Sequence, residues 1–519
     1  MTAGRTGVAR FGRIGTLAIG HNRSEMTDAT DSTTRTLRNF IGGGWVEAAG
    51  SETLEDSNPA TGEVQALVPL SGEADVDAAV RAAREAYPAW RATPPQKRAR
   101  AVMALREVLW ANREELAQLV TEDMGKTLSD AQGEVLRGIE SVEAACGIPH
   151  LLKGENLEGV ASGVDVELIR QPVGVCAAIT PFNFPAMIPL WFLPYAIACG
   201  NTFILKPSER DPRPSERIIE LLAGVEEIPD GVVNLVHGGR DAVNGLLDHA
   251  DIDAISFVGQ ASTARYIAER SAATGKRCQA LGGAKNSLVV MPDADLEVSV
   301  PAIMSSSFGA AGQRCLAGSV AVVVGSDARQ NEVVRALSDA ASALGVGPGD
   351  AEGVEVCPLI GPEARKRIES ALETAVAGAD EVVLDGRSLG PADGGPGRAL
   401  IGPSIVETSD TEGELAREEL FGPLLAIVRV ADLDAALEFV NGSRYGNAGS
   451  IFTTSGEAAR GYRYGVEAGM IGVNVGVAAP VAWFPFSGWK DSIDGDLHAN
   501  GADAVEFYTR KKVVTSRWS

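Results

Sequence analysis

Apolar residues recur at helical spacing in the first third of the chain. The clearest of these patterns covers residues 73–91 and consists of Val76, Ala79, Val80, Ala83 and Tyr87. A spacing of three and four residues places such side chains on one face of a helix. Similar patterns predict two more long helices, over residues 95–124 and 128–147.

Short β-rich runs alternate with helical patterns from residue 173 onward. We expect strands over residues 175–180, 202–205, 232–236 and 254–258. The helices expected between them cover residues 214–222, 242–247 and 262–271. This order predicts an α/β fold with a parallel, doubly wound sheet. A second α/β region begins with a strand over residues 287–291 and continues to about residue 480.

Residues 171–205 contain no charged side chain. A run of this length could span a membrane on hydrophobicity alone. Prolines interrupt it at five positions, namely Pro172, Pro181, Pro185, Pro189 and Pro194. We therefore expect a buried strand, a turn and a buried helix, and no contact with a membrane.

Two strand patterns stand apart from both α/β regions. They cover residues 165–170 and 507–515, and the first is amphipathic. Because neither belongs to a predicted sheet, we expect them to form an added ribbon through which copies of the chain associate. The pattern leaves a dimer and a tetramer equally open.

The amino-acid composition limits the classes of molecule that the protein is expected to bind. The chain has 519 residues and a formal net charge of −23, and its 46 basic residues include only ten lysines. An acidic, lysine-poor surface argues against nucleic-acid binding. It fits a protein kept soluble at high salt, or a GC-rich genome that replaces Lys by Arg, and both explanations stay open.

The first 24 residues contain four arginines and no acidic residue. They form either a targeting peptide or a segment upstream of a true start at Met26. We expect residues 1–34 to be a poorly ordered extension. The six cysteines are scattered without a CxxC pair, and the five histidines lack metal-ligand spacing. We therefore predict no disulfide framework, no metal site and a reducing, cytoplasmic location.

One cysteine has the surroundings of a nucleophile. Cys315 lies in Phe308-Gly-Ala-Ala-Gly-Gln-Arg-Cys-Leu-Ala-Gly-Ser319, where small neighbours let a substrate and backbone amides come close. A thiolate that attacks a carbonyl creates an oxyanion, which needs hydrogen-bond donors. The alternative is a buried cysteine with a packing role, the usual state of a free thiol.

Five motifs then occur in a fixed order. They are Pro-Phe-Asn-Phe-Pro (residues 181–185), Lys-Pro-Ser-Glu (206–209), Phe-Val-Gly (257–259), Gly-Gln-Arg-Cys (312–315) and Glu-Leu-Phe-Gly-Pro (419–423). In these motifs the chain resembles the aldehyde dehydrogenase superfamily over about residues 37–518. Residues 476–490 and 497–501 are similar to the CoA-acylating methylmalonate-semialdehyde and malonate-semialdehyde dehydrogenases.

The resemblance implies a Rossmann-type NAD-binding domain, an α/β catalytic domain and a β oligomerisation ribbon. The NAD-binding domain would comprise residues 35–156 and 172–288, and the catalytic domain residues 289–480. The ribbon and the C-terminal segment would comprise residues 157–171 and 481–519.

The resemblance also implies the cofactor-binding residues. They are Thr180, Phe182, Lys206, Glu209, Arg210, Gly259, Gln260, Gly282, Glu419 and Phe421. Lys206 and Glu209 would meet the adenosine ribose, where an acid favours NAD over NADP; a surface ion pair between them is the alternative. The helix after Gly259 would receive the pyrophosphate. Gln260 departs from the Ser that is usual in the family, so a side-chain phosphate contact there is in doubt.

Four residues would carry the chemistry. By resemblance Cys315 is the nucleophile, and the amide of Asn183 with the backbone N–H of Cys315 holds the oxyanion. Arg137 and Arg314 correspond to the pair that binds the substrate carboxylate, and Arg314 is also expected to depress the pKa of Cys315. For Arg137 the alternative is an ion pair on the helix surface with Glu134 or Glu140.

The hydrolytic relatives activate water with a glutamate at the position that Leu281 occupies here. A leucine cannot accept a proton, and general-base catalysis contributes about 10²–10⁴-fold. A thiol needs less help than water, so we expect coenzyme A to release the acyl group. The resemblance thus implies NAD-dependent, decarboxylating oxidation of methylmalonate or malonate semialdehyde to propionyl-CoA or acetyl-CoA. A hydrolytic aldehyde dehydrogenase acting on another aldehyde, of the succinate-semialdehyde type, and a non-enzymatic member of the fold are the alternatives.

Overall fold

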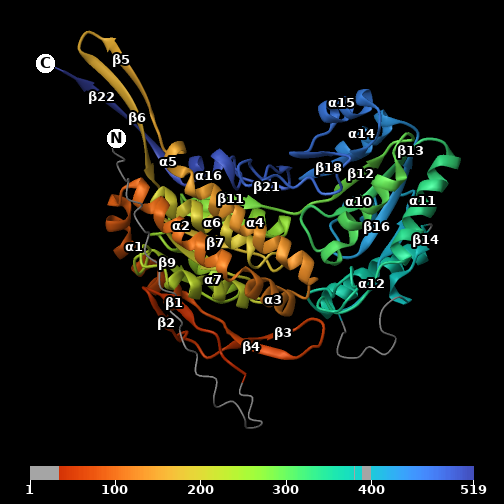
Figure 1. Cartoon of the computed structure of the whole chain (residues 1–519), viewed down its shortest axis with the longest axis horizontal. Helices are drawn as coiled ribbons and strands as arrows, with labels where there is room; N and C mark the ends of the chain where they lie inside the picture. Colours follow the sequence, from red (N-terminus) through yellow and green to blue (C-terminus); the bar gives the residue numbers. More distant parts are fainter. Residues whose placement is uncertain (1–33, 379, 389–398, 519) are drawn as a thin grey trace, which may run out of the picture. The chain divides into compact units, whose positions relative to one another are not determined.

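The computed structural model describes residues 34–378, 380–388 and 399–518. The predicted N-terminal extension lies outside these ranges except for Thr34, so its disorder stays a prediction. Within the described ranges the chain forms two large sheets, three small sheets and the helices that cover them (Figure 1).

The first large sheet has eight strands in the order β2-β1-β9-β8-β7-β10-β11-β21. In chain order they are β1 (Asn39–Ile41), β2 (Gly44–Val46), β7 (Val175–Ile179), β8 (Thr202–Lys206), β9 (Val233–Leu235), β10 (Ala254–Val258), β11 (Arg277–Leu281) and β21 (Ile493–Asp494). The five central strands β9, β8, β7, β10 and β11 run parallel. The predicted doubly wound parallel sheet is therefore confirmed.

Helices cover both faces of this sheet. They are α1 (Glu73–Ala92), α2 (Pro95–Ala111), α3 (Arg113–Met124), α4 (Leu128–Cys146), α5 (Ile148–Leu151), α6 (Met187–Cys199), α7 (Arg213–Ala223), α8 (Arg240–Asp248) and α9 (Ala261–Ala273). Alternate residues of β7 enter different cores: Cys176 packs with α2, α4 and α6, whereas Val175 packs with α1, α8 and α9. This is the period-two pattern of a strand that is buried on both sides.

The second large sheet has seven strands in the order β14-β15-β16-β13-β12-β18-β19. They are β12 (Asn286–Val290), β13 (Gly318–Val324), β14 (Glu381–Leu384), β15 (Ser404–Glu407), β16 (Leu424–Val430), β18 (Ala448–Phe452) and β19 (Met470–Val473). The accompanying helices are α10 (Leu296–Phe308), η1 (Gly309–Gly312), α11 (Asp327–Ser342), α12 (Pro362–Ala377), η2 (Gly386–Ser388), α13 (Glu414–Arg417), α14 (Leu433–Asn441) and α15 (Gly456–Gly465). All neighbours are parallel except β14 and β15, and the sheet has its own apolar core.

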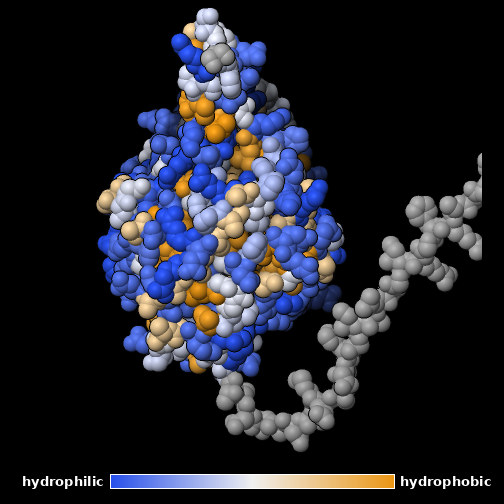
Figure 2. Space-filling model, turned by 90° about the vertical axis from the view of Figure 1, so that its left-hand side faces the viewer, coloured by the Kyte–Doolittle hydropathy of each residue, from blue (hydrophilic) through white to orange (hydrophobic). Residues whose placement is uncertain are grey.

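The two isolated strand patterns pair with each other. β6 (Val164–Pro172) lies between β5 (Glu155–Ala161) and β22 (Thr509–Arg517), antiparallel to both. The last strand begins two residues later than predicted, because α16 (Gly501–Phe507) precedes it. The ribbon projects from the rest of the described chain (Figures 1 and 2). The remaining strands are β3 (Thr53–Ser57) with β4 (Val64–Pro69), and β17 (Tyr445–Gly446) with β20 (Trp489–Lys490).

The structure differs from the sequence prediction at residues 95–124, where one long helix was expected. Asn112 ends α2 and begins α3, with φ −110° and ψ 14°. Its side-chain amide donates to the carbonyl of Val108 at 2.7 Å. A short polar side chain that bonds to nearby backbone competes with helix continuation, and apolar periodicity does not report that competition.

The charge-free segment forms β7, the buried helix α6 and β8, as predicted. Within the described ranges, none of the helices combines the length and apolarity needed to cross a membrane.

Candidate active site

Cys315 lies in the loop that joins η1 to β13. Before it, Ala310 and Ala311 adopt left-handed backbone conformations, with φ of 49° and 52°. Such conformations cost about 1–3 kcal/mol each and persist where surrounding contacts enforce them. Here the side-chain amides of Asn286 and Asn447 both donate to the carbonyl of Cys315, each at 2.9 Å. The backbone of Cys315 is thus held by Asn286, the first residue of β12, and by Asn447, which directly precedes β18.

Two cavities meet at Cys315. The first has a volume of about 290 Å³ and is lined by Arg137, Glu140, Trp191 and Phe486 among others. The second has a volume of about 690 Å³ and extends along the carboxyl ends of the parallel strands of the first sheet. Because Cys315 lines both, a group bound in either cavity can reach the same sulfur atom.

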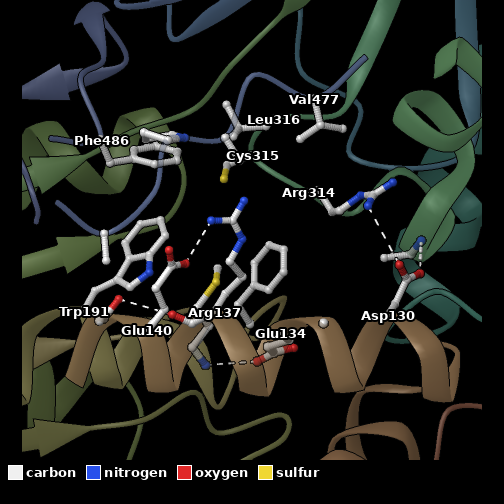
Figure 3. A pocket seen from close by; sticks show the side chains of 18 of the residues that line it. Asp130, Glu134, Arg137, Glu140, Trp191, Arg314, Cys315, Leu316, Val477 and Phe486 are labelled. Carbon is white, nitrogen blue, oxygen red and sulfur yellow. Dashed lines mark hydrogen bonds and ion pairs between the residues drawn. The ribbon is translucent and has the colours of Figure 1, made fainter. Parts of the chain in front are cut away.

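Arg137 projects from α4 into the first cavity and points toward the sulfur of Cys315 (Figure 3). Its guanidinium donates to the carboxylate of Glu140 at 2.9 Å, one turn further along the helix. The ion pair that the sequence offered as an alternative therefore exists, but both residues line the cavity. The other suggested partner, Glu134, pairs instead with Lys126 at 2.6 Å.

Arg314 is oriented differently from Arg137. Its guanidinium points away from Cys315 toward Asp130 (Figure 3), at 3.9 Å from the carboxylate, and donates to the carbonyl of Ser305. Burial, and after it the charge of Glu419, raises the pKa of the Cys315 thiol to about 12, although Arg314 acts in the opposite direction. Arg314 does lower the pKa of Cys315, as expected, but burial and the charge of Glu419 outweigh its effect.

Asn183 lies with Cys315 on the wall of the second cavity. The residue is 4% exposed, and its backbone carbonyl accepts a hydrogen bond of 2.8 Å from the ammonium of Lys126. The structure thus brings together the two groups that the sequence assigned to the oxyanion.

All ten residues predicted to bind the cofactor line the second cavity as well. They are Thr180, Phe182, Lys206, Glu209, Arg210, Gly259, Gln260, Gly282, Glu419 and Phe421. Lys206 and Glu209 form an ion pair at 2.8 Å; the lysine is 3% exposed but the glutamate side chain is 35% exposed, so the pair is half-buried at the cavity wall. Burial raises the pKa of Glu209, but the ammonium of Lys206 outweighs it and holds that pKa below its usual value. Gln260 precedes the first turn of α9, and its side chain accepts no capping hydrogen bond there.

The comparison with a family model decides the family. The model described as the aldehyde dehydrogenase family matches residues 45–514. The chain belongs to the aldehyde dehydrogenase family. The fold and the resemblance expected from the five motifs are thereby confirmed.

Similar proteins narrow the resemblance within the family. Malonate-semialdehyde dehydrogenase 1 of Geobacillus kaustophilus is 49% identical over 490 residues, 94% of this chain and 99% of that protein. The malonate-semialdehyde dehydrogenase of Halalkalibacterium halodurans is 46% identical over 482 residues, 93% of this chain and 98% of that protein.

Solved structures of methylmalonate-semialdehyde dehydrogenases are also similar to this chain. The crystal structure of methylmalonate-semialdehyde dehydrogenase from Oceanimonas doudoroffii has a TM-score of 0.90 and 43% identity, covering 94% of this chain and 99% of that one. A structure from Sinorhizobium meliloti, assigned as a methylmalonate-semialdehyde dehydrogenase and complexed with NAD, has a TM-score of 0.91 and 42% identity, with the same coverage of 94% and 99%.

In this aldehyde dehydrogenase, sequence reasoning missed the support beneath Asn183. The buried pair of Lys126 and Glu134 is 1% and 0% exposed, and Glu134 also accepts the backbone N–H groups of Ala186 and Met187 at 2.8 and 3.1 Å. It therefore fixes the turn that carries Asn183. Lysine is scarce in this chain, so Lys126 directly after a helix-ending glycine was the one available signal.

Leu281 ends β11 and is 3% exposed. It packs in the apolar core of the first sheet and is not among the described residues that line either cavity. At this position the chain therefore has no proton acceptor.

Proposed function

We propose that this aldehyde dehydrogenase oxidises malonate or methylmalonate semialdehyde, with NAD as oxidant, and transfers the decarboxylated acyl group to coenzyme A. The observation that carries this proposal is the place of Cys315 at the junction of the two cavities, with Arg137 on one side. The names of relatives at 46–49% identity support the semialdehyde as the substrate class.

The residues of the second cavity fit NAD. The hydroxyl of Thr180 is buried and has no hydrogen-bond partner among the described residues, so it is available to a ligand. A side chain at Gly282 would come within 2.8 Å of the carbonyl of Asp491, so the glycine lets these two segments pack closely at the cavity wall. The free N–H groups at the start of α9 suit a pyrophosphate, and Glu209 disfavours a 2′-phosphate. When bound there, NAD would accept the hydride that leaves the adduct on Cys315.

The residues of the chain would carry out the acyl chemistry. The Cys315 thiolate adds to the aldehyde carbon, while the amide of Asn183 and the N–H of Cys315 stabilise the oxyanion. Loss of hydride converts the adduct into a thioester that carries a carboxylate at its β position. Arg137, which faces the sulfur, would hold that carboxylate through paired charge-assisted hydrogen bonds.

Decarboxylation then breaks the bond between the α carbon and the carboxylate. The electron pair remains on the α carbon as a thioester enolate, and a proton converts it into an acetyl or propionyl thioester. The thiol of coenzyme A adds to the thioester carbonyl after losing its own proton, and Cys315 leaves as a thiolate. Leu281 supports this acceptor, because water would have no general base at that position.

A single-turnover experiment tests the proposal. The enzyme with NAD and malonate semialdehyde should release NADH in one burst, and release of acetate should stay slow until coenzyme A is added. Acetyl-CoA and one CO₂ per NADH are the expected products, identified by mass spectrometry. Rapid release of free acid without coenzyme A would support the hydrolytic alternative instead.

We also infer that the ribbon of β5, β6 and β22 joins copies of the chain. Its exposed apolar side chains include Leu157, Val160 and Val513, exposed by 64%, 46% and 63%. Apolar residues on projecting strands with an unpaired edge favour association.

A further inference from the structure

Arg314 is held in an orientation that its neighbours define closely. Its guanidinium donates to the carbonyl of Ser305 and lies 3.9 Å from the carboxylate of Asp130. Ser305 and Asp130 line a separate cavity of about 430 Å³ that does not include Cys315. Arg314 and Asp130 also line the cavity into which Arg137 points, but within it the guanidinium of Arg314 is turned away from Cys315 toward Asp130 (Figure 3).

Gly309 provides the space for this orientation. A Cβ atom at Gly309 would lie 2.7 Å from Cζ of Arg314, and its nearest contacts are all atoms of that guanidinium. The backbone there has φ −57° and ψ 139°, which any residue adopts. The glycine is therefore required by Arg314 and not by the backbone.

Asp130 joins this arrangement to the loop that carries the nucleophile. It lies in the first turn of α4, and its second carboxylate oxygen accepts the N–H of Ala310 at 3.1 Å. Asp130 therefore holds both the left-handed turn before Cys315 and the guanidinium of Arg314.

We propose that Asp130 and Gly309 hold Arg314 away from Cys315 and so determine how strongly the enzyme selects an aldehyde with a carboxylate. Asp130 acts as a positioning residue, and Gly309 provides the space that the held guanidinium occupies. This inference rests on the proposed function, in which Arg137 holds the substrate carboxylate, and it adds Arg314, when turned inward, as a second donor to that carboxylate. The substrate carboxylate binds to the conformation in which Arg314 is turned toward Cys315. Because the enzyme rarely adopts that conformation, the apparent affinity of the enzyme for the carboxylate is reduced.

Releasing Arg314 should raise the selectivity for the carboxylate. We expect Asp130→Asn and Gly309→Ala each to lower the KM for malonate semialdehyde relative to the KM for propanal by about three- to tenfold. The double variants that also carry Arg314→Leu should show no such change in the ratio, because the effect passes through Arg314.

A second measurement needs neither NAD nor a semialdehyde. Iodoacetate and iodoacetamide alkylate the same thiol and differ in charge, so the ratio of their rates at Cys315 reports a cation near the sulfur. We expect this ratio to rise in Asp130→Asn and Gly309→Ala, and to return to the parental value when Arg314→Leu is added. Peptide mass spectrometry separates Cys315 from the other five cysteines, and thermal melting confirms folding.

The outcomes separate the two proposals. An unchanged alkylation ratio in folded Gly309→Ala would overturn the role of Arg314's orientation, whatever the natural substrate is. If Asp130→Asn lowered the turnover of malonate semialdehyde and propanal equally, Asp130 would stabilise the Cys315 loop and would not position Arg314. If the alkylation ratio changed but the enzyme showed no preference for aldehydes with a carboxylate, Asp130 and Gly309 would still position Arg314, and the proposed substrate would be wrong.

Discussion

The carboxylate of Glu140 accepts a hydrogen bond of 2.9 Å from Arg137, and the guanidinium so held points toward the sulfur of Cys315 (Figure 3). The two residues lie three positions apart on α4, where side chains are neighbours on one helix face. A cation that faces the sulfur across the same cavity suits an aldehyde that carries a negative charge.

Replacement of Arg137 should affect charged substrates selectively. We expect Arg137→Leu to raise the KM for malonate semialdehyde by about 10–100-fold, because a charge-assisted hydrogen bond is worth about 1.5–3 kcal/mol. The KM for propanal should change much less. Steady-state assays of NADH production measure both. Arg100→Leu, an exposed position on α2, is the matched control, and equal effects on both aldehydes would refute the carboxylate role.

A base at position 281 should change the acyl acceptor. We expect Leu281→Glu to raise the release of free acid without coenzyme A, by up to about 10²–10⁴-fold if its carboxylate reaches the thioester. Leu281→Gln has the same shape without the base and should leave this rate unchanged. Since Leu281 is buried, both variants will lose stability, and circular dichroism must establish that they fold. Equal rates of free-acid release in Leu281→Glu and Leu281→Gln would contradict the idea that the missing base at position 281 keeps hydrolysis slow.

The charge of Glu419 should slow the reaction of Cys315. Burial raises the pKa of Glu419 to about 7, and its carboxylate in turn raises the pKa of the thiol. We therefore expect Glu419→Gln to lower the pKa of Cys315, which would shift the pH profile of its alkylation by iodoacetamide toward lower pH. Glu418→Gln, at the exposed neighbour that pairs with Arg444, is the control. A shift toward higher pH would show that the carboxylate assists the thiolate instead.

Three buried acids should make stability fall as the pH rises. Asp56, Asp123 and Asp211 are fully buried, and burial raises the pKa of Asp56 from 3.8 to about 6 and the other two pKa values well above the usual range. The folded protein then binds more protons than the unfolded chain. For Asp56 the stabilising contribution is complete below the unfolded pKa and is lost as the pH rises through about 6.

Asp56→Asn imitates the protonated side chain, so its melting temperature should fall less than that of the parent between acidic and neutral pH. Differential scanning calorimetry across that range measures the difference. Asp339→Asn, at an exposed position of α11, should show the parental slope. A steeper fall in Asp56→Asn than in the parent would contradict the assignment.

Charge on the ribbon should prevent association. We expect Val513→Asp, on β22, to shift the protein to a smaller species in light scattering coupled to gel filtration, because a carboxylate is costly in an apolar interface. Val376→Asp, at a valine exposed by 60% on α12, is the matched control. An unchanged mass in both variants would place the interface elsewhere.

Local patterns predicted most of the elements. The alternation of apolar runs and helical spacing from residue 173 predicted the parallel strands in order, and the two isolated strand patterns, now β6 and β22, do pair. The break at Asn112 was missed, since it depends on one side-chain hydrogen bond. The role of the ribbon and the boundaries between domains stay predictions.

The sequence by itself determined which residue types meet the substrate, because the motifs around Asn183, Lys206, Cys315 and Glu419 are each local and ordered along the chain. Only the tertiary structure decided how the two arginines beside the site are oriented. Arg137 points toward Cys315 because Glu140 holds it from the same helix, whereas Arg314 is turned away from Cys315 because the fold brings Asp130 of α4 against the segment that carries Gly309 and Arg314. The same holds for the thiol: a motif names it, but the surrounding burial and the charge of Glu419 set its pKa.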